Sequence, residues 1–192
     1  REAVETITEL IEYYKGIFTI LSSCAARQLE EVTFRRNTIP VQELFDAAGK
    51  YFRKVTKNRT EKVELIIEPM DAKVIGDVNQ LRFLFENLID EALAVREEGM
   101  IRLQARKDNE YIRFLFTDTR REKSVTELNQ LFYPNLARMT SGEKGELRGT
   151  EYLICKQIIR DHDEFAGRRG CRINAEPAEG GGFTVYFTIP RR

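Results

Sequence analysis

The sequence predicts a two-layer α/β sandwich, in which helices cover one face of a mixed β-sheet. Helical and strand-like segments follow in the order helix, helix, two strands, helix, hairpin, irregular segment, helix, two strands. The helical segments have apolar residues on one face, and the strand-like segments end at proline or glycine or surround a turn pair. Placing the helices on one face of a mixed sheet buries both kinds of apolar surface, which predicts this fold class.

The first 36 residues predict a long helix separate from the sandwich. Residues 3–36 contain no proline, and apolar residues recur there at alternating steps of three and four, with a gap at Gln28. This heptad pattern is typical of a helical hairpin or a dimeric bundle, and a helix folded back on its own domain is the alternative. We therefore divide the chain into an N-terminal helix, residues 1–36, and a domain, residues 37–192. The heptad residues are Val4, Ile7, Ile11, Tyr14, Phe18, Leu21, Ala25 and Val32.

The middle of the chain predicts a helix, two strands and a second helix. Residues 37–40 break the first helix at Pro40, and an amphipathic helix follows up to about Val55. Residues 63–68 and 72–75 read as strands that end at Pro69 and Gly76. Asp77 is then a suitable N-cap for a helix that runs to about Val95.

The C-terminal half predicts a hairpin, a helix and two closing strands. Residues 100–106 and 111–117 surround the turn pair Asp108-Asn109. Residues 118–148 are polar and irregular, with a short helical piece at 125–132. A helix over about 150–161 precedes strands near 171–175 and 183–189.

Composition excludes several classes of function. Lysine plus arginine equals aspartate plus glutamate, so the formal net charge is zero and no basic surface for nucleic acid is indicated. No apolar stretch approaches the roughly 20 residues of a membrane-spanning helix, so we expect no membrane contact by these residues. Three widely spaced cysteines favour reduced thiols and a cytoplasmic location.

Five segments match the motif order of one known family. They are residues 76–92, 116–119, 131–134, 149–159 and 172–190. In that order they resemble the N box, the first glycine box, the F box, the second glycine box and the last two strands of the catalytic domain of sensor histidine kinases. These kinases form the GHKL ATPases together with gyrase B and MutL. The resemblance covers about residues 39–190 and implies ATP and magnesium as ligands.

The resemblance implies roles for two residues of the predicted helix after Asp77. Asn87 and Glu91 lie four residues apart and therefore on the same face. In the family the corresponding pair serves the catalytic water and the magnesium ion, so Asn87 is the candidate water-positioning residue and Glu91 the candidate magnesium ligand. The family normally has asparagine where this chain has Glu91. The alternative is that Asp90 and Glu91 form a solvated helix face.

Asp118 matches the aspartate that accepts a hydrogen bond from the adenine amino group in the family. The family pattern there is Asp-x-Gly-x-Gly, but Arg120 and Glu122 replace both glycines here. Glycine lets a backbone approach a ligand closely, and larger residues do not. Asp118 is therefore either an adenine-binding residue or a turn cap that is left from a lost pocket.

The second glycine box is also altered. Gly149 is retained, but Glu151 takes the place of another glycine at a helix N-terminus, where the family holds phosphate. A carboxylate there satisfies the helix dipole itself and competes with phosphate for the free amides. In the preceding lid, Lys144 and Arg148 are the basic residues that the resemblance implies could reach the phosphates, and a solvated loop is the alternative.

The only histidine, His162, lies near the end of the last predicted helix. Sensor kinases carry their phosphoacceptor histidine on the first helix of a dimerisation hairpin. We therefore expect residues 1–36 to be the second helix of such a hairpin, with the first helix upstream in the parent protein.

The resulting hypothesis is a degenerate catalytic and ATP-binding domain of a two-component sensor histidine kinase. It would bind ATP weakly or not at all and act as a regulatory or scaffolding module. Its expected partners are the dimerisation helices of the parent protein, within a homodimer, and a response regulator. It would lie in the cytoplasm or in the cytoplasmic part of a membrane-anchored sensor. The alternatives are an active ATP-dependent kinase domain with an atypical pocket and a structural dimerisation module.

Overall fold

The computed structural model describes residues 34–133 and 150–192, together with Val4, Ile7, Ile11, Tyr14 and Phe18. The chain divides into two compact units, residues 1–33 with 133–150 and residues 34–132 with 151–192. Most of the long helix predicted for residues 3–36 lies outside the described residues, and residues 34–36, which are described, are not helical. No helix in the described part of the chain is long and apolar enough to cross a membrane.

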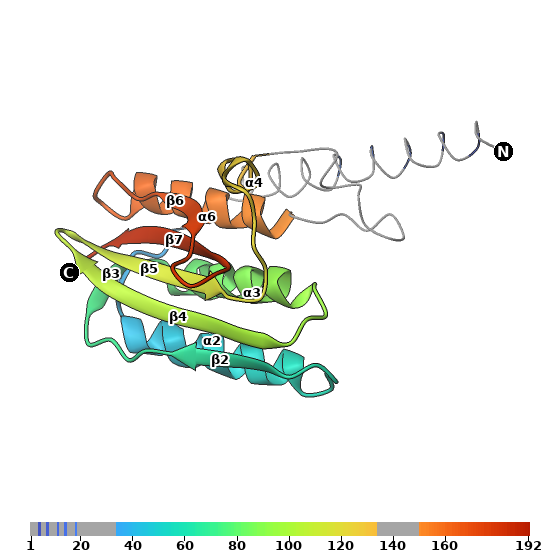
Figure 1. Ribbon diagram of the computed structural model, residues 1–192. Helices are drawn as coiled ribbons and strands as arrows, with labels where there is room; N and C mark the ends of the chain where they lie inside the picture. Colours follow the sequence, from blue (N-terminus) through green and yellow to red (C-terminus); the bar gives the residue numbers. More distant parts are fainter. Residues whose placement is uncertain are drawn as a thin grey trace. The chain divides into compact units, whose positions relative to one another are not determined.

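The larger unit is built on a five-stranded mixed sheet, as predicted (Figure 1). The strand order is β2-β4-β5-β7-β6. β2 pairs with β4 in parallel, and the other neighbours are antiparallel. The strands are β2 (Val63–Ile67), β4 (Gly99–Asp108), β5 (Tyr111–Asp118), β6 (Ile173–Pro177) and β7 (Phe183–Pro190).

Three long helices cover one face of this sheet, which confirms the two-layer α/β arrangement (Figure 1). They are α2 (Val41–Thr56), α3 (Val78–Leu93) and α6 (Thr150–Phe165), and a short helix, α4 (Val125–Asn129), precedes the undescribed segment 134–149. Four buried phenylalanines join α2 and α3 to the sheet. The rings of Phe114 and Phe187 stack at 4.9 Å, and Phe45 and Phe85 meet Phe114 edge-on.

A second, two-stranded sheet was not predicted. β1 (Asn37–Pro40) pairs antiparallel with β3 (Lys73–Gly76). The sequence predicted only a helix break at residues 37–40. A four-residue strand that ends in proline gives almost no periodic signal, and its formation depends on pairing with residues 73–76, far along the chain.

Several element boundaries differ from the predicted ones. α6 continues to Phe165, one turn beyond the predicted end, because His162 packs into the interior and Gly167, at φ +90°, is the first residue to adopt a left-handed conformation. α4 stops at Asn129, and β6 starts at Ile173 instead of Cys171. The β4–β5 turn occurs at the predicted place, with Asn109 at φ 52°.

Candidate functional site

The candidate site lies between the C-terminal end of α3, the end of β5 and the start of α6. α3 begins where predicted, since the Asp77 side chain accepts hydrogen bonds from the backbone amides of Asn79 and Gln80. Asn87 and Glu91 lie on this helix, and Asp118 is the last residue of β5. Asn87 is buried, and its side-chain amide donates to the carbonyl oxygen of Phe83 at 2.7 Å.

The Asp118 carboxylate is buried and accepts four hydrogen bonds from the two residues that follow Thr119. Its Oδ1 accepts from the backbone amide of Arg120 at 3.0 Å and from Nε of Arg120 at 2.8 Å. Its Oδ2 accepts from Nη2 of Arg120 at 2.9 Å and from Nη2 of Arg121 at 3.4 Å. A carboxylate offers about four lone-pair positions, so these four hydrogen bonds occupy all of them.

Arg120 is held in place from several directions. Its side chain is 1% exposed, and its guanidinium also donates to the carbonyl oxygens of Ala92, at 2.6 Å, and Glu97, at 3.1 Å. The backbone of Gly99 makes room for the arginine stem, because a Cβ there would lie 2.7 Å from Cγ of Arg120. Arg120 thus links the end of β5 to the C-terminal end of α3.

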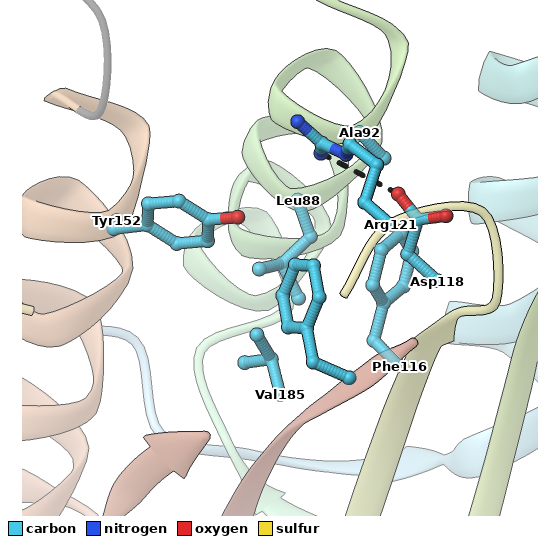
Figure 2. Close-up of a pocket in the computed structure, with 8 residues that line it drawn as sticks. Leu88, Ala92, Phe116, Asp118, Arg121, Tyr152 and Val185 are labelled. Atoms are coloured by element: carbon cyan, nitrogen blue, oxygen red, sulfur yellow. Dashed lines mark hydrogen bonds and ion pairs between the residues drawn. The ribbon is translucent and has the colours of Figure 1, made fainter. Parts of the chain in front are cut away.

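The cavity beside Asp118 is filled by side chains (Figure 2). Figure 2 shows Arg121 and Tyr152 reaching into it from opposite sides above Leu88 and Val185. The volume that the centre of a water molecule could occupy in this cavity is about 0 Å³. Pockets that bind small molecules usually enclose about 300–1,000 Å³. The lining residues are Leu88, Ala92, Phe116, Asp118, Arg121, Tyr152, Phe183 and Val185.

Two carboxyl groups meet next to this cavity. The pKa of Glu91 is raised to about 7, first by burial and then by the charge and hydrogen bond of Glu151, against the opposing charges of Arg121 and Lys123. Burial also raises the pKa of Tyr152, with a contribution from the Glu91 charge. Near neutral pH Glu91 is therefore protonated for part of the time.

A comparison with protein families identifies the chain. The model for "Histidine kinase-, DNA gyrase B-, and HSP90-like ATPase" matches residues 76–192, more than half of the sequence. The chain belongs to this ATPase family. A search of curated proteins finds no match.

Solved structures of sensor histidine kinases share the fold of this ATPase-family domain. The mycobacterial sensor histidine kinase MprB superposes with a TM-score of 0.61 and 18% identity, over 82% of this chain and 99% of that one. The histidine kinase AdeS of Acinetobacter baumannii gives 0.64 and 12%, over 97% and 83%. Histidine kinase ThkA, crystallised with the response regulator TrrA, gives 0.68 and 18%, over 100% and 51%.

The site residues expected from the motifs divide into two groups. Asn87 and Glu91 lie on the helix, and Asp118 at the end of the strand, that the sequence predicted for them, and Arg121 interacts electrostatically with both Glu91 and Asp118. Gly149, Lys144 and Arg148 lie outside the described residues. Among the described residues, no group of three or more histidine, cysteine, aspartate or glutamate side chains is arranged to hold a metal ion.

Sequence reasoning missed several groups that shape the site of this ATPase-family domain. It did not identify the Ala92 and Glu97 carbonyls or Gly99 as the surroundings of Arg120. Backbone carbonyls carry no sequence signal, and only the positive φ of Gly99 marks its role. Lys123 was also missed. Its ammonium nitrogen lies 5.5 Å from the centre of the Phe183 ring, and its charge lowers the pKa of Glu91.

Proposed function

We propose that this chain is a histidine-kinase-type domain that works without bound nucleotide and serves in two-component signalling as a regulatory or scaffolding module. The observation that carries the proposal is the carboxylate of Asp118, whose four accepting positions are taken by Arg120 and Arg121. An adenine amino group at this position would have to displace a buried arginine that also binds two backbone carbonyls.

The phosphate end of the site supports the same proposal. Glu151 is in the first turn of α6, where its carboxylate favours the positive end of the helix dipole. Glu91 lies close enough to share a hydrogen bond with Glu151. A phosphate group about 4 Å from either carboxylate would be repelled by roughly 1 kcal/mol in water and about 4 kcal/mol at intermediate screening. Each 1.4 kcal/mol weakens binding about tenfold.

The proposed partners follow from the family and from one related structure. ThkA was crystallised with its response regulator TrrA, and its structure covers the whole length of this chain. We propose that residues 37–192 are the domain and that residues 1–36 are the second helix of a dimerisation hairpin. In this role the domain would contact the dimerisation helices and a response regulator. The parent protein would be a homodimer, and this region of it would lie in the cytoplasm.

Calorimetry tests the loss of nucleotide binding. The chain is titrated with magnesium and a non-hydrolysable ATP analogue, and a histidine-kinase catalytic domain that binds ATP serves as the positive control. We expect no binding heat up to about 1 mM ligand, since the repulsion above removes several factors of ten in affinity. Micromolar binding would overturn the proposal.

An active kinase with an atypical pocket is the second candidate, and one observation favours it. Asn87 is retained, buried, on the helix that carries the water-positioning residue in this family. Phosphotransfer from labelled ATP to the histidine of the full-length protein would support this candidate. In that case Asn87→Ala should abolish transfer, and a variant that still transfers phosphate would remove Asn87 from the mechanism.

A further inference from the structure

Helices α3 and α6 run antiparallel and contact each other at three levels. Where α3 starts and α6 ends, the backbone amide of Asp77 donates to Nε2 of His162 at 3.1 Å. At the middle, the Cys155 thiol lies 3.7 Å from the carbonyl oxygen of Leu84. Where α3 ends and α6 starts, Glu91 and Glu151 form the carboxyl pair of the candidate site. The two ends are about 21 Å apart along α3, at 1.5 Å per residue.

The end away from the site is also where the chain enters the domain. The ring of Phe34 packs edge-on against the His162 ring, with centroids 4.8 Å apart. The backbone amide of Arg35 donates to Oδ2 of Asp77 at 2.9 Å. The other oxygen of Asp77 caps α3. We call Phe34, Arg35, Asp77 and His162 the entry junction.

The entry junction holds both helices through the buried polar side chains of Asp77 and His162. His162 is 0% exposed, and its Nδ1 lies 2.8 Å from the carbonyl oxygen of Ile158. The bond from the Asp77 amide requires an unprotonated Nε2, so Nδ1 carries the proton and donates to Ile158. Only glycine fits at position 76, since a Cβ there would lie 2.7 Å from Nε2. A shift of the ring would therefore break its hydrogen bonds with the Asp77 amide and the Ile158 carbonyl oxygen.

We propose that the entry junction sets the packing of α3 against α6, so that a displacement of Phe34 changes the geometry of the candidate site at the opposite end of both helices. The preceding chain would act through Phe34 and Arg35, and the rigid helices would carry the shift. The role of the far end rests on the proposed function, but the coupling itself does not require nucleotide. The coupling can therefore be tested independently of the calorimetric test of nucleotide binding.

Hydrogen exchange of the full 192-residue chain tests this coupling. In Phe34→Ala the ring contact with His162 is lost, and we expect the amides of Ile89 to Leu93 to exchange at least about tenfold faster. Amides of the central strand β5, which open only on global unfolding, serve as the internal reference. Phe34→Tyr keeps the ring and should exchange like the wild type, and Val125→Ala on α4 is the matched surface control.

Two outcomes would overturn the coupling. In the first, faster exchange in Phe34→Ala is confined to residues 34–36 and the last turn of α6, so the ring acts only locally. In the second, the α3 amides accelerate by the same factor as β5, so the variant merely destabilises the whole domain. If Phe34→Ala does not fold, Phe34→Leu gives the same comparison with a smaller perturbation.

Discussion

The aspartate at position 118, which the sequence suggested as an adenine-binding residue, accepts hydrogen bonds from an arginine two positions further along the chain. β5 ends at Asp118, and Arg120 supplies donors that the carboxylate would otherwise seek in a ligand or water. A buried aspartate and arginine of this kind are stable only as a pair.

This pairing predicts the effect of removing one partner. Asp118→Ala leaves the guanidinium of Arg120 buried without its counter-ion, and we expect a loss of about 3–5 kcal/mol in the free energy of unfolding. Urea denaturation measures it. Asp108→Ala, which breaks the half-exposed pair with Arg113, is the matched control and should cost no more than about 1 kcal/mol. Equal effects of the two variants would contradict the structural role of Asp118.

The Glu91–Glu151 pair predicts a pH dependence. The folded-state pKa of Glu91, about 7, exceeds the ordinary value of 4.5, so the folded protein binds more protons between these values. The contribution of this group to stability is present below pH 4.5 and is lost as pH rises through 7. Glu91→Gln removes this slope, and we expect the variant to be more stable than the wild type at pH 8.

Urea unfolding at pH 5 and pH 8 checks this expectation, with Glu64→Gln on the exposed part of β2 as the control. A wild-type stability that rises between these values and falls with Glu91→Gln at pH 8 would show that Glu91 is stabilised as a carboxylate.

At the scale of elements, the turn between β6 and β7 positions the end of β5. Gly182 has φ +80°, and a Cβ there would lie 2.1 Å from the carbonyl oxygen of Asp118. Gly180 has a similar φ of +89°, but no atom lies within 4 Å of its added Cβ. An alanine at Gly180 would therefore destabilise the fold only through its backbone conformation, whereas an alanine at Gly182 would also collide with neighbouring atoms.

Alanine variants of these two glycines should therefore differ in stability. Gly180→Ala should cost about 1–2 kcal/mol, the penalty for a left-handed conformation. Gly182→Ala adds a collision with the backbone of β5 and should cost at least about 1 kcal/mol more. Thermal unfolding of both variants measures the difference. Identical melting temperatures would mean that the β6–β7 turn relaxes away from Asp118 without cost.

The elements also show what a sequence can reveal. Strong periodicity and the Asp77 cap predicted α3 to within two residues, and the Asp108-Asn109 pair located the hairpin. β1 escaped prediction because its pairing with β3 is a tertiary contact. In the site, the motif order indicated where Asp118 lies, but the side chain that satisfies it depends on how Arg120 folds back under α3.

For the whole molecule, the core belongs to the larger unit. Its buried apolar residues run from Ile39 to Ile189 and include the four phenylalanines that join α2 and α3 to the sheet. We expect the fragment 34–192 to unfold in one cooperative transition, with a melting temperature within about 4 °C of the whole chain, which corresponds to roughly 1 kcal/mol.

Circular dichroism during heating measures this, and the fragment 41–192 is the control. That fragment lacks Phe34 and β1, so we expect it to melt lower than the fragment 34–192. A fragment 34–192 that melts far below the whole chain would show that residues 1–33 take part in the core.

The interlocking of Asp118, Arg120 and Gly99 also restricts how this lineage can change. Replacing Arg120 alone leaves the Asp118 carboxylate buried without its main partner. Replacing Gly99 alone places a methyl group against the Arg120 side chain. Under the proposed function, a descendant could therefore gain purine recognition only by changing more than one of these residues. Among close relatives, acidic 118 and arginine 120 should be inherited or lost together.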